Sequence, residues 1–87
     1  MRTVDTFEII HEERGKALAI VLGSPDGPDG ATIRFDTFYT RIWSFQTAIF
    51  NLGEQCGKVG VFPSHNIMPA LFAKLEEHWT RIGQEVR

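Results

Sequence analysis

The chain lacks the features that mark secreted and membrane proteins. Its single cysteine, Cys56, cannot form an internal disulfide, so cross-links do not compensate for small size as they do in secreted mini-domains. No apolar run approaches the about 18 residues of a membrane span, and no basic-then-apolar leader is visible. We therefore expect a cytoplasmic protein without a membrane partner.

A cluster of positive charge is also missing. Nine Lys and Arg residues against eleven Asp and Glu residues give a net charge of −2, and neither half of the chain is basic. Binding to the phosphates of a duplex requires several clustered cations. We therefore expect no nucleic-acid partner.

Sequence patterns of metal binding and phosphate binding are absent. His11, His65 and His78 do not share the spacing of metal ligands, and the glycines form neither a Gly-x-x-x-x-Gly-Lys nor a Gly-x-Gly-x-x-Gly motif. We expect His78 to be solvated at the edge of the charged face of the last helix. The sequence predicts no catalytic residue, no metal site and no cofactor, and it favours a protein that is not an enzyme.

One set of residues invites a thiol-hydrolase hypothesis, because a thiolate nucleophile needs a nearby imidazole and an orienting group. Cys56, His65 and Asn66 supply these three groups. However, we expect Cys56 before a strand and His65 beyond its far end, on the order of 15–25 Å apart if the strand is extended. We therefore interpret Cys56 as an ordinary free thiol.

The residues that are present predict a folded core. The chain is 43% hydrophobic, 11% aromatic and 23% charged, which is typical of a globular protein and not of a disordered one. Its 87 residues leave room for one domain, over residues 1–87. Three stretches of apolar and β-branched residues predict an antiparallel meander, and they are Thr3–Ile10, Ala17–Leu22 and Ala31–Phe35.

Two amphipathic helices are expected after the meander. The first runs from about Phe38 to Leu52 and ends at Gly53, although the preceding strand continuing to Tyr39 is a competing interpretation. A fourth strand over Lys58–Phe62 precedes the last helix, which has Pro69 in its first turn. The predicted fold is α+β with two layers in the order β-β-β-α-β-α. A mostly antiparallel four-stranded sheet of undetermined strand order is covered by two helices.

A predicted core follows from these elements and their hydrophobic periodicity. Its members are Leu18, Ile20, Leu22, Ile33, Phe35, Ile42, Phe45, Ile49, Val61, Leu71, Leu75 and Ile82.

The first predicted helix has only one charged residue, which is unusual for a helix that faces water. The last helix packing against it is one explanation. The other is that another chain covers it, since Tyr and Trp are enriched at interfaces and small hydroxyl residues let helices approach closely. We hypothesise an interface with a protein partner or in a homo-oligomer, formed by an aromatic stripe and adjacent small residues: Tyr39, Trp43, Phe50, Thr40, Ser44 and Thr47.

An alternative site lies in the turn Phe62–Asn66, between the fourth strand and the last helix. Free N–H groups and the dipole at a helix N-terminus favour an anion. Ser64, His65 and Asn66 add polar side chains there, and simple helix capping also explains them. This turn predicts, as the alternative function, a small-ligand or anion-binding protein or an enzyme.

Overall fold

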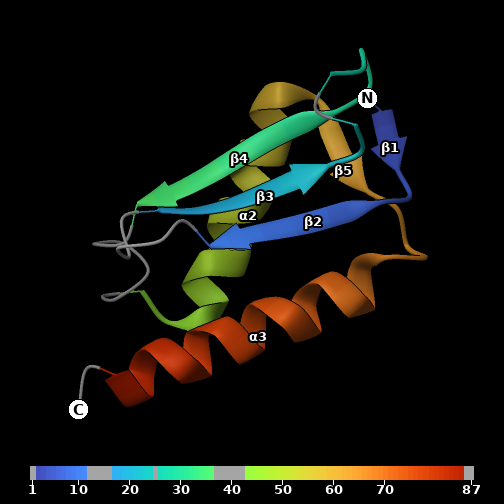
Figure 1. The fold of residues 1–87 in the computed structure, drawn as a ribbon. Coiled ribbons are helices and arrows are strands. Elements are labelled where there is room, and N and C mark those ends of the chain that lie inside the picture. Colours follow the sequence, from blue (N-terminus) through green and yellow to red (C-terminus); the bar gives the residue numbers. More distant parts are fainter. Residues whose placement is uncertain (1, 12–16, 25, 37–42, 86–87) are drawn as a thin grey trace.

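A computed structural model describes residues 2–11, 17–24, 26–36 and 43–85 of the chain. These ranges confirm the α+β class, with strands and two helices arranged as Figure 1 shows. The elements are β1 (Arg2–Val4), β2 (Phe7–His11), β3 (Ala17–Leu22), β4 (Ala31–Asp36), α2 (Phe45–Val59), β5 (Val61–Pro63) and α3 (Met68–Glu85).

The predicted antiparallel meander is present as the sheet β2-β3-β4. Its register places Ile9 opposite Ile20 and Ile20 opposite Ile33, so the three side chains form one row. Because side chains alternate between the faces of a strand, this register gathers most of the large apolar residues on one face, while Ile10, which is 40% exposed, lies on the other. The former face is the side of the sheet that belongs to the core.

The sheet differs from the predicted four-stranded one, because the expected strand Thr3–Ile10 is two strands. The chain bends at Asp5 and Thr6, and β1 leaves the meander to pair with β5 in a separate parallel sheet. Polar contacts hold this bend: the Ser64 hydroxyl donates to Asp5 Oδ1 at 2.5 Å, and Gly23 N–H donates to the Thr6 carbonyl at 2.9 Å. Both halves are rich in β-branched residues, so the break is invisible in the pattern.

The predicted helix Phe38–Leu52 differs from α2, which begins at Phe45 and ends at Val59. The start of that prediction over residues 38–42, like the competing strand continuing to Tyr39, lies outside the described residues. Ser44 is the N-cap, and its hydroxyl accepts a hydrogen bond from Thr47 N–H at 3.1 Å. The helix passes through Gly53 and stops at Gly60, whose φ of 75° gives the left-handed conformation of a C-cap. Lys58 and Val59 of the predicted fourth strand, Lys58–Phe62, therefore belong to α2, and the strand itself is β5, Val61–Pro63.

Most of the predicted core is confirmed. Eight of its residues are buried: Leu18, Ile20, Leu22, Ile33, Phe35, Val61, Leu71 and Leu75. Phe45 and Ile49 are only partly buried against this cluster, while Ile42 and the side chain of Ile82 lie outside the described residues. The shifted register of α2 instead buries Ala48, Leu52 and Cys56.

The last helix packs on the core through residues at helical spacing. Leu71 and Leu75 are buried, and His78 continues the same face, so its side chain is only 6% exposed. Our expectation of a solvated His78 is therefore wrong. Its ring lies edge-on to Trp79, with centroids 5.6 Å apart. Neither described helix combines the length and apolar character that spanning a membrane requires.

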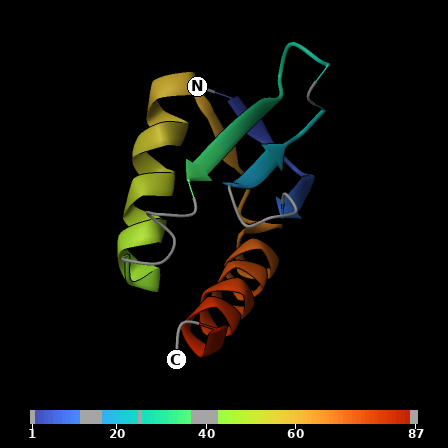
Figure 2. The ribbon, with the colours of Figure 1, turned by 60° about the vertical axis from the view of Figure 1, so that its left-hand side comes forward.

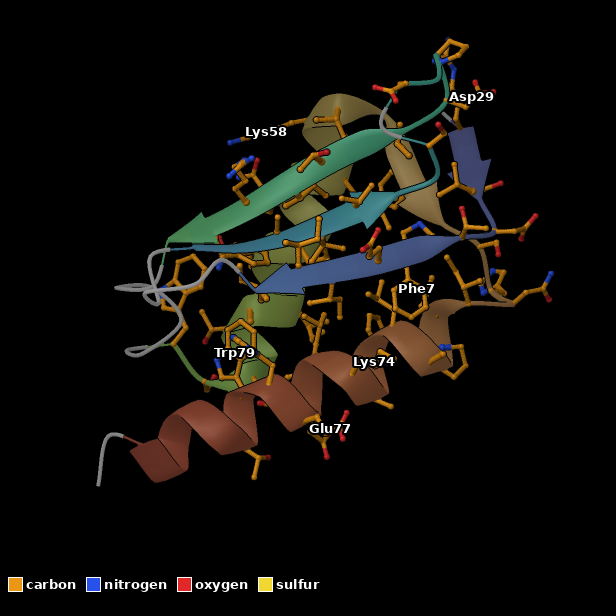
Figure 3. The ribbon with its side chains drawn as sticks, in the orientation of Figure 1. Phe7, Asp29, Lys58, Lys74, Glu77 and Trp79 are labelled. Carbon is orange, nitrogen blue, oxygen red and sulfur yellow. The ribbon has the colours of Figure 1, made fainter. Side chains whose placement is uncertain are left out.

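Trp79 ties α3 to the segment that leads into α2. Its indole Nε1–H donates to the Trp43 carbonyl at 3.0 Å, and Figure 3 shows the side chain extending from α3 towards the start of α2. The Trp43 ring in turn packs edge-on against Phe35, with centroids 6.1 Å apart. These contacts join both helices to β4.

We expect Leu75→Ala to lower the free energy of unfolding by about 2–5 kcal/mol, because it removes a side chain that is 1% exposed and leaves a cavity. Urea denaturation followed by circular dichroism measures the loss. Glu76→Ala, at the exposed neighbouring position, is the control and should change little. Equal, small effects of both substitutions would contradict the orientation of α3.

We expect Trp79→Phe to destabilise the protein by about 1–3 kcal/mol, because the Trp43 carbonyl loses its donor in a partly buried place. The phenyl ring is smaller than the buried indole, so lost packing adds to the loss of the hydrogen bond. Thermal and urea denaturation measure it. A variant as stable as the unmodified chain would show that water replaces the indole at no cost.

Candidate interaction surface

The outer face of α2 is the side opposite its buried residues. Ala48, Leu52 and Cys56 follow one another at intervals of four and are all buried. Such residues lie on one side of a helix, so the opposite side points away from the core. Figure 2 shows α2 at the side of the molecule, with one flank towards the sheet and the other facing away from it.

Phe50 lies on this outer face and is 67% exposed, more than the other exposed large hydrophobic residues of the described ranges. Gly53 and Gly57 follow it at spacings of three and seven. At about 100° per residue, the three positions fall within roughly 60° of one another around the helix. We call Phe50, Gly53 and Gly57 the Phe50 face.

Within the described ranges, neither the conformation nor the surroundings of the two glycines of the Phe50 face require a glycine. Among the residues that the structure describes, no heavy atom beyond the helix's own backbone lies within 4 Å of a Cβ placed at Gly53 or Gly57, and neither glycine has the positive φ found at Gly60. A glycine inside a helix costs about 1 kcal/mol relative to alanine. The fold therefore carries a cost in helix stability that its own packing does not require.

Charged residues border the Phe50 face on one side only. Glu54 and Lys58 are exposed, four residues apart and of opposite sign. They lie about 40° and 80° around the helix from Phe50 at 100° per residue. The border therefore adds no net charge that would select for or against a partner.

The predicted aromatic stripe does not lie along one helix. Trp43 precedes the N-cap of α2, and its ring is half-buried against Phe35, so part of it is covered by its own chain. Phe50 alone of the stripe is exposed on α2. Tyr39 and Thr40 lie outside the described residues, and their part in an interface stays a prediction.

Ser44 and Thr47 are exposed, but the start of α2 already uses their polar groups. The two hydroxyls lie 2.9 Å apart, and Ser44 also accepts from Thr47 N–H. The Thr47 carbonyl accepts from the Asn51 side chain at 2.9 Å. Helix capping thus accounts for these residues. The sequence analysis did not predict that Gly53 and Gly57 lie on the exposed face of a helix, because it took Gly53 as the residue that ends the helix. The signal that could have shown it is the four-residue spacing of the two glycines, which is about one helical turn.

The turn Phe62–Asn66 uses the polar groups of Ser64 within the chain. Its hydroxyl donates to Asp5, its N–H donates to the Val4 carbonyl, and its carbonyl accepts from Ile67 and Met68 N–H. The Asp5 carboxylate also places negative charge beside the start of α3. His65 and Asn66 are exposed. Contacts within the chain therefore account for the polar groups of Ser64, and an anion at this turn stays a prediction.

Cys56 lies in the last turn of α2, although the sequence analysis placed it outside a helix, before the fourth strand. It is 1% exposed, and burial raises the pKa of its thiol above the usual value. A nucleophilic cysteine needs the reverse, a lowered pKa and access to solvent. Among the residues that the structure describes, no group of three or more His, Cys, Asp and Glu could hold a metal ion.

Comparisons of the chain with protein-family models, with curated proteins and with solved structures give no match.

We expect Cys56 to react slowly with a thiol reagent in the folded protein and rapidly after unfolding, because its side chain is buried. Release of a chromophore from an aromatic disulfide, with and without urea, measures both rates. The raised pKa also means that the folded state holds the thiol proton more tightly than the unfolded state does. The resulting contribution of Cys56 to the free energy of unfolding is present below the unfolded pKa of about 9 and is lost as the pH rises further. Equal rates in both states would contradict this burial.

Proposed function

We propose that this chain is a small non-catalytic interaction or regulatory protein that binds a second copy of itself or another protein through the outer face of α2. The observation that carries the proposal is the exposure of Phe50, 67%, beside two helical glycines that open onto empty space. An exposed aromatic ring next to a flat surface is suited to burial by another chain.

The shape of the Phe50 face suits a partner helix. Packed helices lie about 8–10 Å apart, with the smaller separations where side chains at the contact are small. Gly53 and Gly57 permit such an approach, and Phe50 projects beside them as the apolar group to be covered. Burying a phenylalanine ring contributes roughly 1.5–3 kcal/mol. In a contact with this face, burial of Phe50 would therefore supply affinity, and the two glycines would allow the partner helix to pack closely.

The extent of α2 bounds how strong this contact can be. Its 15 residues make a helix about 22 Å long. Stable interfaces bury upwards of about 1,000 Å² in total, while transient ones are smaller. A contact restricted to α2 belongs to the transient class. A stable dimer needs further surface, to which the sequence hypothesis assigns Tyr39 and Thr40.

A second copy is compatible with the charges of this surface. Glu54 and Lys58 are of opposite sign, so two identical faces do not carry like net charge towards each other. A two-fold axis would bring the same face of each copy together, which is the commonest arrangement of small oligomers.

We expect Phe50→Glu to abolish association without lowering the free energy of unfolding of the monomer. The new carboxylate would be buried without a partner in the complex but solvated in the free chain. Sedimentation velocity over a range of protein concentrations measures association, and urea denaturation measures stability. The matched control is Val59→Glu, because Val59 is 48% exposed on the same helix but lies on the other side from Phe50. It should leave association unchanged.

We expect Gly53→Ala combined with Gly57→Ala to have opposite effects on the two measurements. The monomer should gain about 1–2 kcal/mol of stability, because alanine favours the helix and each Cβ meets open space. Association should weaken, because the added methyl groups hold a partner helix away. A variant that is more stable yet associates as before would show that the glycines are not at the contact.

The two possible partners give different results. Concentration-dependent association that Phe50→Glu abolishes supports a second copy. If the chain stays monomeric at millimolar concentration, binding to other proteins is measured instead. Binding must then be lost with Phe50→Glu and kept with Val59→Glu. A monomeric chain whose binding to every such protein survives Phe50→Glu would overturn the proposal.

A further inference from the structure

We draw no further inference here: the strongest candidate, the outer face of α2 around Phe50, Gly53 and Gly57, belongs to the surface already described, and nothing in the structure shows which partner covers it.

Discussion

The parallel pairing of β1 with β5 is the constraint on which the described arrangement depends. It joins residues nearly sixty positions apart, with Arg2 opposite Val61 and Val4 opposite Pro63. Backbone bonds extend the pairing at both ends, from Arg2 N–H to the Gly60 carbonyl and from Ser64 N–H to the Val4 carbonyl. The short sheet thus fixes where α2 must end and where the chain enters α3.

Contacts at either end of β1 bind this sheet to the meander. Arg2 reaches the loop before β4, where its side chain donates to the Pro28 carbonyl and lies 3.5 Å from Asp29. The ion pair is exposed and contributes little by itself. At the other end, Gly23 N–H, just after β3, donates to the Thr6 carbonyl at the bend into β2. Val4 and Val61 are both buried, so apolar burial stabilises this junction, while the polar contacts set the direction of the chain.

The two faces of α2 affect the stability of the folded chain in opposite ways. Its inner face buries Leu52 and Cys56 in the core, and this burial offsets the cost of glycines inside the helix. Its outer face exposes Phe50 beside those glycines, an arrangement that adds nothing to the stability of the folded chain. Residues that cost stability without serving the fold are expected where a protein binds another molecule. The proposed interaction surface rests on this contrast.

Local pattern by itself determined the α+β class, the three-stranded meander, the last helix and eight buried core residues. Runs of apolar and β-branched residues and helical spacing are properties of neighbouring residues, so they can be read without the fold. The candidate site was predicted only in part. Phe50 was named for its aromatic ring. Gly53 and Gly57 were not assigned to the surface, because in a sequence a glycine indicates the end of a helix as readily as a position inside it.

The tertiary structure alone decided the break at Asp5, the bounds of α2 and the burial of His78 and Cys56. The break depends on Ser64, which lies far along the chain, and Gly53 stays helical because α2 packs on the core as far as Cys56. A cap such as Ser44 or Gly60 is one of several candidates in the sequence, and packing chooses among them. Sequence determined which side chains are apolar, whereas contacts between distant residues decided which of them stayed exposed.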